Sequence, residues 1–233
     1  MNESGDQVLI TGTNRGIGLE FVKQYADAGY RVIACCRDPL KAAALNSLAA
    51  ASGGKVALHA LDVSNFGQIE HLAAEFKGQA IDLLINSAGY YPHASFGSID
   101  YAEWHKAFLI NTMAPMRMVE CFIEQVAASR LRKIVTLSSI MGSIAANDSG
   151  GSTLYRTSKA ATNMLMKNLA IALKPRGIAT LTLHPGWVKT DMGGAHALIT
   201  AEESVAGMRA VIDALTADNA GRFVSYDGHE NPW

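Results

Sequence analysis

The sequence has few cysteines and no excess of either charge. Its cysteines number three in 233 residues, and two of them, Cys35 and Cys36, are adjacent, so in a strand their side chains would point to opposite faces. An odd cysteine count with this spacing argues against a disulfide framework and favours a reducing compartment. The formal net charge is −1, so the chain has no basic surplus to neutralise the phosphates of a nucleic acid.

Signals for membrane insertion and secretion are also lacking. No apolar stretch approaches the roughly 20 residues that span a bilayer. The first residues, MNESGDQ, have neither the basic start nor the apolar run of a signal peptide. Hydrophobic residues make up 49% and charged residues 18% of the chain, as in compact globular proteins. We therefore expect a soluble cytoplasmic protein that binds neither nucleic acid nor membrane.

Short apolar runs alternate with helical patterns along the whole chain. Strands are expected at 7–11, 31–36, 55–61, 81–86, 133–139, 178–184 and 221–227, and helices at 16–28, 39–51, 65–77, 112–128, 155–173 and 202–216. The strands barely alternate between apolar and polar residues, as strands buried on both faces do. The pattern predicts an α/β chain with a doubly wound Rossmann fold, a parallel sheet of about seven strands between two helical layers. No linker or repeat divides the chain, so residues 1–233 are predicted to form a single domain.

Three long loops rich in small and polar residues follow predicted strands, at 87–99, 140–153 and 186–200. Because the strands are parallel, these loops should meet at the carboxyl edge of the sheet, where open α/β folds bind ligands. They are the first places to look for a functional site.

The first strand runs directly into a glycine-rich turn, TGTNRGIG at residues 11–18. Gly12, Gly16 and Gly18 would permit a tight turn and let the backbone approach a pyrophosphate, and the following helix offers free N–H groups. A turn without any ligand would also fit these glycines. Their place after the first strand of an α/β alternation favours a dinucleotide.

The end of the second strand bears on which dinucleotide would bind. Arg37 stands there, and Arg15 lies inside the glycine turn. Guanidinium groups at this place accommodate a 2′-phosphate, so the pair favours NADP(H) over NAD(H). Arg37 would alternatively be a solvated loop charge, neutralised by the neighbouring Asp38.

Tyr155 and Lys159 are four residues apart in a predicted helix, so their side chains rise on one face. A phenol, with an ordinary pKa of about 10, is a poor base at neutral pH. A neighbouring ammonium is expected to lower that pKa, so that Tyr155 can exchange a proton with a substrate oxygen. Most Tyr-x-x-x-Lys pairs, however, occur by chance on protein surfaces, so a catalytic role for this pair depends on the other motifs of the chain.

Six motifs along the chain resemble those of the short-chain dehydrogenases/reductases. They are TGTNRGIG, NSAG at 86–89, Asn111, the serines at 138–139, YRTSK at 155–159 and HPGWVKTDM at 184–192. The resemblance covers nearly the whole chain. Within the family, SSIMGSIAANDSGGSTLYRTSKAA, LHPGWVKTDMGG and GRFVSYDGHENPW look like the sniffer and C-factor-like carbonyl reductases.

The resemblance implies a role for each member of a catalytic group. Ser139 would hold and polarise a substrate carbonyl, and Tyr155 would be the general acid in reduction and the base in oxidation. Lys159 would lower the pKa of Tyr155 and bind the nicotinamide ribose. Asn111 would hold a water that links Lys159 to solvent, although a satisfied amide inside a helix would account for Asn111 equally well.

The resemblance also implies a set of cofactor contacts. These are Gly12, Asn14, Arg15, Gly16, Ile17 and Gly18 in the turn, Arg37 at the 2′-phosphate of the adenosine ribose, Asp62 and Val63 at the adenine, Asn86, Ala88 and Gly89 on the adenosine side, then Tyr155 and Lys159, and finally Pro185, Gly186, Val188 and Thr190 at the nicotinamide. Two features depart from the family pattern. Ser87 replaces the usual second asparagine of the NSAG motif, and the segment between Ser139 and Tyr155 is longer than in most members.

The loops suggest a mostly apolar substrate pocket, which suits an aromatic or aliphatic aldehyde or ketone. Its candidate lining residues are Tyr90, Tyr91, His93, Phe96, Ile140, Met141, Trp187, Met192 and His196. Each of these side chains would fit equally well as a packing residue that covers the sheet edge. The histidines lack metal-ligand spacing, so no metal site is expected.

The favoured function is an NADPH-dependent carbonyl reductase. An NAD(P)-dependent alcohol dehydrogenase working oxidatively and a C-factor-like dinucleotide-binding signalling protein with little turnover are the alternatives. The family resemblance implies a homodimer or homotetramer. Leu165, Met166, Leu169 and Leu173 recur at helical spacing and would be core or dimer interface, of which core is the commoner role.

Overall fold

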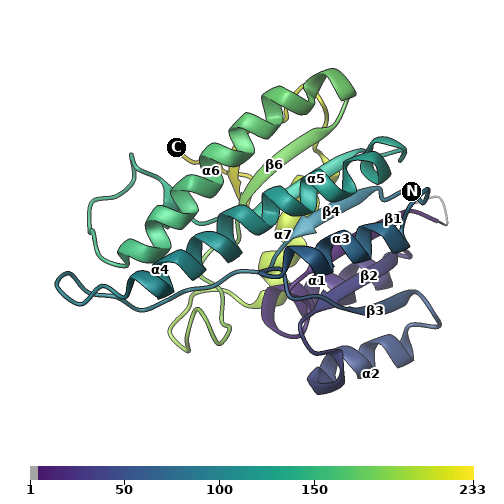
Figure 1. The fold of residues 1–233 in the computed structure, drawn as a ribbon, viewed down its shortest axis with the longest axis horizontal. Coiled ribbons are helices and arrows are strands. Elements are labelled where there is room, and N and C mark those ends of the chain that lie inside the picture. Colours follow the sequence, from purple (N-terminus) through teal and green to yellow (C-terminus); the bar gives the residue numbers. More distant parts are fainter. Residues whose placement is uncertain (1–4) are drawn as a thin grey trace.

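Parallel strands form the centre of the molecule, as the computed structural model of residues 5–233 shows (Figure 1). The strands are β1 (Gln7–Thr11), β2 (Arg31–Cys36), β3 (Val56–Ala60), β4 (Leu83–Asn86), β5 (Lys133–Leu137), β6 (Ala179–His184) and β7 (Phe223–Ser225). They form a seven-stranded sheet in the order β3-β2-β1-β4-β5-β6-β7, in which every neighbouring pair is parallel. The predicted strands and the Rossmann-like fold are confirmed.

The strand order reverses at the middle of the sheet. β1 pairs with β2 on one side and with β4 on the other, so the chain builds the sheet outward from β1 in two opposite directions. Connections that follow β1 and β4 therefore leave the same sheet edge toward opposite faces and open a crevice between them. This reversal fixes where a ligand site can form.

Helices cover both faces of the sheet. They are α1 (Gly16–Asp27), α2 (Ala43–Ala51), α3 (Phe66–Glu75), α4 (Tyr101–Phe108), α5 (Ala114–Ala127), α6 (Thr153–Leu173) and α7 (Ala201–Asp213). One core cluster joins α1, α2 and α7 to strand residues such as Val8 and Ile10. The other joins α3, α5 and α6 to residues such as Leu9. Successive strand residues thus enter opposite clusters, which is why the strands read as continuous apolar runs.

Two helical segments differ from the sequence prediction. The helix expected over 39–51 is split into a 3-10 turn at Pro39–Lys41 and the shorter α2. The helix α4 was not predicted at all. Only Ala107 of α4 is buried, so the segment carries no apolar periodicity, and its start is instead fixed by Asp100, whose carboxylate accepts the N–H groups of Ala102 and Glu103.

A π-helical turn, Leu109–Met113, connects α4 to α5. Single π-helical turns inside a helix are rare and occur frequently at functional sites. This one carries Asn111, which is 1% exposed. The unusual backbone therefore coincides with a residue that the motifs had already selected.

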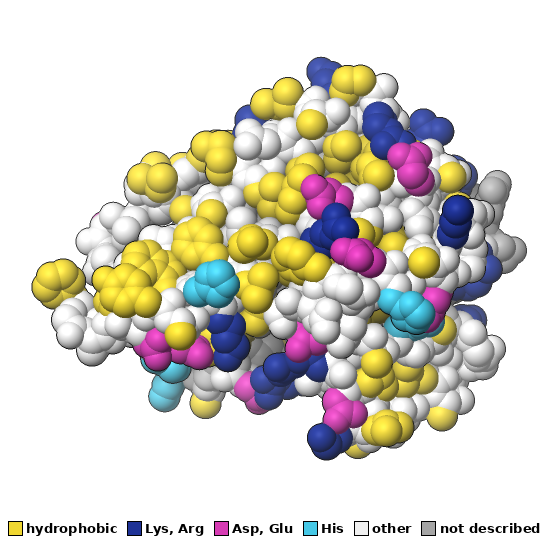
Figure 2. All heavy atoms as spheres, in the orientation of Figure 1, with side chains coloured by type: hydrophobic (Ala, Val, Ile, Leu, Met, Phe, Trp, Pro, Cys, Tyr) yellow, Lys and Arg dark blue, Asp and Glu magenta, His cyan; other side chains and the backbone are white. Residues whose placement is uncertain are grey.

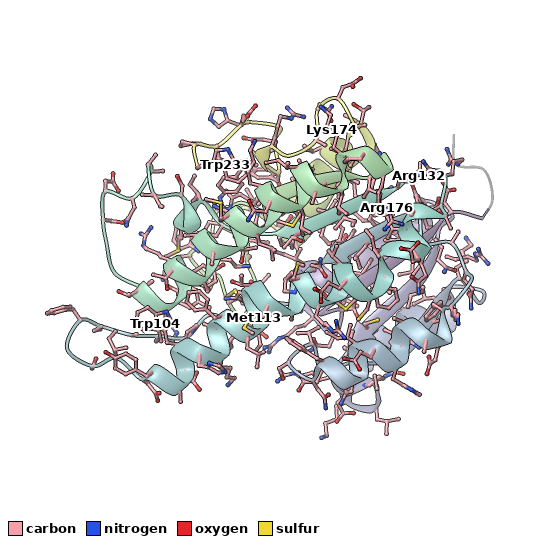
Figure 3. The ribbon with its side chains drawn as sticks, turned by 45° about the horizontal axis from the view of Figure 1, so that its top comes forward. Trp104, Met113, Arg132, Lys174, Arg176 and Trp233 are labelled. Carbon is pink, nitrogen blue, oxygen red and sulfur yellow. The ribbon has the colours of Figure 1, made fainter. Side chains whose placement is uncertain are left out.

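The apolar stripe of α6 belongs to the core. Met166, Leu169 and Leu173 are buried in the cluster beneath the helix, so core was the correct choice between the two roles considered. Met164 and Ile171 lie on the other side of α6 and are exposed. Figure 3 shows α6 running from the neighbourhood of Trp104 on α4 to Lys174 at its far end.

The helices of residues 5–233 include none that combines the length and the apolar character needed to cross a membrane. The exposed apolar side chains gather elsewhere. Figure 2 shows hydrophobic side chains over α4 and the loop before it, where Phe96 and Tyr101 are exposed.

Candidate active site

The turn after β1 leaves no room for side chains. Gly12 has φ = +74°, and a Cβ placed on it would stand 2.7 Å from the Cα of Ala88. A Cβ on Gly18 would stand 2.1 Å from the carbonyl oxygen of Gly12. Because both distances are far shorter than any real Cβ contact, only glycine lets α1 start this close to β1 and to the segment after β4. The result is a bare backbone cradle at the N-terminus of α1.

The NSAG segment is tied to this cradle by its main chain. The Thr11 hydroxyl accepts the N–H groups of Ser87 and Ala88, each at 3.1 Å. The Asn86 amide donates to Thr136 on β5 at 3.2 Å, while its Oδ1 is buried without a partner among residues 5–233. Ser87 thus contributes to this contact through its backbone, so replacing the usual asparagine leaves the connection between β1 and β4 intact.

The end of β2 and the end of β3 meet beside the cradle. The N–H of Leu61 donates to the carbonyl of Cys36 at 2.8 Å, which brings Asp62 close to the exposed Arg37. Asp62 accepts the N–H of Ser64 and so keeps its carboxylate in a fixed turn, with Val63 buried behind it. The candidate adenosine contacts are therefore together at one end of the crevice.

Arg15 and Asp38 are each held by another partner. The guanidinium of Arg15 pairs with Asp191 at 2.7 Å, across the mouth of the crevice. Asp38, expected as a possible partner for Arg37, pairs with Lys41 at 2.8 Å. Both pairs are largely exposed to solvent, so each contributes little to the stability of the fold.

The segment after β6 lies over the glycine turn. Gly186 has φ = +82°, and a Cβ there would stand 2.9 Å from the Tyr226 ring. Val188 is buried and pairs with Ile199. The methyl group of Thr190 would lie 3.2 Å from a Cβ on Gly16. The candidate nicotinamide segment, which begins at Pro185, is thus brought against the cradle as predicted.

Tyr155 is a buried phenol near the start of α6. It is 8% exposed, and the side chain of Ser139 lies near its hydroxyl. Burial raises the pKa of Tyr155 to about 12; the nearby Ser139 side chain works against this rise, and the neighbouring Tyr91 adds to it. The predicted lowering of this pKa is therefore wrong for the structure as it stands, because desolvation of the phenolate outweighs every stabilising contact.

Lys159 lies one turn further along α6, on the same face. Its ammonium is 5.8 Å from the centroid of the Tyr155 ring and donates to the carbonyl of Leu137 at 2.8 Å. Burial lowers the pKa of Lys159 to about 8. The Cα of Gly89 is close by, since a Cβ there would stand 4.0 Å from the ammonium nitrogen. The i, i+4 pair is thus an internal arrangement and not a surface coincidence.

The two serines at the end of β5 have different surroundings. Ser138 points toward α6, where its hydroxyl donates to Asn163 at 2.6 Å. Ser139 begins the 3-10 turn Ile140–Gly142, accepts the N–H of Met141 at 3.1 Å and has its side chain near Tyr155. The choice of Ser139 over Ser138 agrees with this geometry.

Asn111 is a fully engaged amide. Its Oδ1 accepts the N–H of Tyr90 at 2.8 Å, and its Nδ2 donates to the Tyr90 carbonyl at 2.8 Å and to Ser158 at 2.9 Å. The side chain therefore fixes the backbone at the start of the 87–99 loop and links it to α6. A water-holding role for Asn111 stays a prediction.

One structurally necessary residue was not singled out from the sequence. A Cβ on Gly142 would stand 2.7 Å from the carbonyl carbon of Lys159, so the turn that carries Ser139 packs directly on the backbone of α6. Its glycine, three residues after Ser139, was the available signal. This contact sets the distance between the serine and the Tyr155 helix.

The predicted pocket residues separate into two groups. Tyr91 lies beside Tyr155, with 4.5 Å between ring centroids, and His93 packs against Tyr91. Tyr90 turns away and hydrogen-bonds to Glu103 on α4. Phe96 is fully exposed, and Trp187 and Met192 are about half exposed. Residues 5–233 include no group of three or more His, Cys, Asp or Glu side chains suited to a metal ion.

The side chains brought together can hold a polar oxygen and exchange a proton with it. Two hydroxyl groups, from Ser139 and Tyr155, lie near each other beside a buried ammonium. A bare glycine cradle and a helix N-terminus lie at the same sheet edge. Such an arrangement is typical of enzymes that bind a dinucleotide and reduce or oxidise a small molecule.

Comparison with known proteins agrees with this geometry. The family described as short chain dehydrogenase matches residues 6–198. C-signal of Myxococcus xanthus is 44% identical over 154 residues, which cover 66% of this chain and 93% of that protein. The NADPH-bound carbonyl reductase from chicken fatty liver has a TM-score of 0.92 and 32% identity, and the match covers 99% of this chain and 100% of that one. Carbonyl reductase Sniffer of D. melanogaster also has a TM-score of 0.92 and 32% identity, with 98% and 99% covered.

The chain therefore belongs to the short-chain dehydrogenase family. The resemblance drawn from the six motifs is confirmed, including its similarity to sniffer carbonyl reductases and to C-signal. The protein is an oxidoreductase by family and fold.

Proposed function

We propose that the protein is an NADPH-dependent reductase of aldehydes or ketones, with Tyr155 as the proton donor. Residues 1–233 would act as one domain that both binds the dinucleotide and carries the catalytic group. The observation that carries the proposal is the buried Ser139–Tyr155–Lys159 arrangement next to the glycine cradle. The NADPH-bound chicken reductase, with the same fold, supports it.

The residues present fit a dinucleotide. A Cβ on Gly12 or Gly18 would overlap neighbouring backbone, so the turn presents bare main chain next to the N-terminus of α1, where free N–H groups suit a pyrophosphate. The remaining cofactor contacts implied by the motifs surround this cradle. Bound NADPH would supply the hydride that reduces the carbonyl carbon.

The protein's own groups would supply the proton and hold the substrate. Ser139 would donate a hydrogen bond to the carbonyl oxygen, which polarises the C=O bond and orients it. Tyr155 would give its proton to the same oxygen as the oxygen gains charge. Lys159 would stabilise the resulting phenolate by its positive charge. The products are the alcohol and the oxidised cofactor.

The environment of Tyr155 favours the reductive direction. Because its pKa is raised to about 12, the phenol keeps its proton throughout the neutral range. A protonated phenol is ready to donate, whereas oxidation of an alcohol needs the phenolate as base. The alternative, an alcohol dehydrogenase working oxidatively, would need the positive charge of a bound oxidised nicotinamide to lower this pKa.

The proposal is tested by following NADPH oxidation by the purified protein with a panel of aldehydes, aromatic ketones and α-diketones, and with NADH in parallel. We expect turnover with NADPH on at least one carbonyl class and weaker turnover with NADH. Tight NADPH binding without turnover of any carbonyl would contradict the reductase proposal.

Arg37 is expected to set the preference for the phosphorylated cofactor. Charge-assisted hydrogen bonds contribute about 1.5–3 kcal/mol, so Arg37→Ala should lower kcat/KM for NADPH by roughly 10–100-fold. The value for NADH should change by less than about threefold, since NADH has no 2′-phosphate. Lys41→Ala, which removes an exposed cation three residues beyond Asp38, is the matched control. Equal losses with both cofactors would refute this assignment.

Asp191 is expected to compete with the cofactor for Arg15. The Arg15–Asp191 pair is exposed, so releasing it involves at most about 1 kcal/mol. Asp191→Asn should therefore lower KM for NADPH by about two- to fivefold and leave KM for NADH nearly unchanged. Asp38→Asn serves as the control carboxylate at the same rim. A higher KM for NADPH in Asp191→Asn would show that the ion pair helps binding.

A second candidate function is a dinucleotide-dependent signalling protein with little turnover. The identity of 44% to C-signal over two thirds of this chain favours it. Against it, a pure sensor has no physical need for a proton-transfer group such as Ser139, Tyr155 and Lys159. A biological effect that survives Tyr155→Phe while NADPH still binds would select this candidate.

We also propose that the protein is a homodimer or homotetramer. Met164 and Ile171 are exposed on α6, on the side turned away from the sheet, and burying them against another copy would remove apolar surface from water. Light scattering on the purified protein distinguishes these states from a monomer.

A further inference from the structure

Ser152, the residue before α6, has an unusual backbone. It lies in the left-handed region, with φ = +43° and ψ = +40°, and it is one of two non-glycine residues with positive φ among residues 5–233. Gly150 and Gly151 before it also have positive φ. A left-handed conformation costs a residue with a side chain about 1–2 kcal/mol. Something in the surrounding structure must therefore hold Ser152 in place.

The hydroxyl of Ser152 does not serve as a helix cap. A serine at this position commonly accepts a backbone N–H of the first turn, and Ser152 makes no such bond. Its hydroxyl is instead hydrogen-bonded to the phenol of Tyr91, with 2.7 Å between the oxygens. The contact joins the 87–99 loop to the start of the helix that carries Tyr155.

Tyr91 lies between this helix start and the proton donor. Its ring centroid is 4.5 Å from that of Tyr155 at an angle of 52°, and His93 packs edge-on against its other side. The backbone immediately before Tyr91 is fixed as well, since Asn111 binds both the N–H and the carbonyl of Tyr90. Tyr91 is thus anchored at its main chain, at its ring and at its hydroxyl.

We propose that Tyr91 is a positioning residue for Tyr155: its ring limits the movement of the Tyr155 phenol, and its hydroxyl, through Ser152, holds the first turn of α6. Arg156, whose N–H donates to the Ser152 carbonyl, makes the first backbone bond of that turn. Loss of the Tyr91–Ser152 bond would let Ser152 relax toward an ordinary conformation. The start of α6, and Tyr155 with it, would then lose its fixed position relative to Ser139. This inference rests on the proposed reductase function.

The test compares Tyr91→Phe, Ser152→Ala and the double variant. One neutral hydrogen bond corresponds to roughly a three- to tenfold effect, so each single variant should lower kcat by about that factor. KM for NADPH should stay within about twofold, because neither side chain faces the glycine cradle. If one bond carries the effect, the double variant should be no worse than either single variant.

Two further variants separate positioning from a general loss of packing. Ser152→Gly should recover most of the kcat lost in Ser152→Ala, since glycine adopts the left-handed conformation without a tether. Tyr101→Phe removes an exposed phenol, 73% accessible, from the nearby helix α4 and should leave kcat unchanged. Wild-type kcat in Tyr91→Phe, losses that multiply in the double variant, or failure of Ser152→Gly to recover activity would each overturn the proposal.

A readout that needs no turnover keeps this proposal apart from the proposed function. Amide hydrogen exchange at residues 153–156 reports opening of the first turn of α6. It should be about tenfold faster in Tyr91→Phe and Ser152→Ala than in Tyr101→Phe. If the wild-type protein reduces no carbonyl but this exchange pattern is found, the proposed reductase function is wrong, while the proposal that the Tyr91–Ser152 bond holds the start of α6 is supported. If the enzyme is active but Tyr91→Phe and Ser152→Ala leave the exchange rate unchanged, only the proposed role of the Tyr91–Ser152 bond is wrong.

Discussion

Replacing Tyr155 by Phe is expected to lower kcat for carbonyl reduction by about 100- to 10,000-fold. In the proposed mechanism this hydroxyl donates the proton, and a positioned general acid contributes a factor of this size. The ring, which is 8% exposed and packs against Tyr91, is retained in the variant, so the fold should be preserved. The measurement is NADPH oxidation under saturating substrate.

The loss in Tyr155→Phe should fall on kcat and not on cofactor affinity. NADPH binding, followed by its fluorescence, should stay within about threefold of wild type, because the glycine cradle is unaltered. Tyr101→Phe, at an exposed position, is the control for removing a phenol. Residual activity above about one tenth of wild type would show that another group supplies the proton.

Replacing Lys159 by Met is expected to have two opposite effects. Activity should fall by about 100- to 1,000-fold, because the charge that stabilises the Tyr155 phenolate is removed from a buried site. The cofactor-free protein should become more stable at pH 7. A buried ammonium is costly, and a methionine of similar length fills the same space without charge.

The pH dependence of this stability gain follows from the pKa of Lys159. Burial lowers that pKa from 10.5 to about 8, and each pKa unit corresponds to about 1.4 kcal/mol, so the buried charge costs roughly 3 kcal/mol below pH 8. Between pH 8 and 10.5 the unfolded chain binds more protons than the folded one, so the wild-type free energy of unfolding rises with pH. The advantage of Lys159→Met should therefore shrink by about half between pH 7 and pH 9.5.

Urea unfolding of the two cofactor-free proteins at pH 7 and pH 9.5 measures this difference. Lys167→Met, on the same helix at a more exposed position, is the matched control and should show no such pH dependence. A less stable Lys159→Met protein at pH 7 would mean that the bond from Lys159 to the Leu137 carbonyl outweighs the cost of the buried charge.

The sequence was sufficient to predict where the strands lie, because strands buried on both faces consist of continuous apolar runs. Helix α4 was not predicted because it lacks such an apolar pattern. Its apolar contact with the core is slight, and it is stabilised by the Asp100 cap and by Trp104, whose indole N–H donates to Thr157 on α6 at 2.8 Å. Such contacts join residues far apart in sequence and leave no periodic pattern.

In the candidate site, too, some features were predictable from the sequence and others were not. The i, i+4 spacing predicted that Tyr155 and Lys159 share a helix face, and the family resemblance implied that Ser139 acts with them. The left-handed conformation of Ser152 and its hydrogen bond to Tyr91 could not be predicted from the sequence, since the two residues are 61 positions apart. The longer segment between Ser139 and Tyr155 was noticed only as a departure from the family pattern.

By itself the sequence determined the alternation of strands and helices and the glycine turn, because periodicity and local spacing encode them. The proton-transfer residues were predicted from the motifs that the chain shares with its family. Only the tertiary structure decided the direction of the Tyr155 pKa and the contacts of Tyr91 with Ser152 and Tyr155. Each of these depends on how deeply a group is buried and on which distant side chain it meets. Desolvation and long-range hydrogen bonds exist only once the chain has folded.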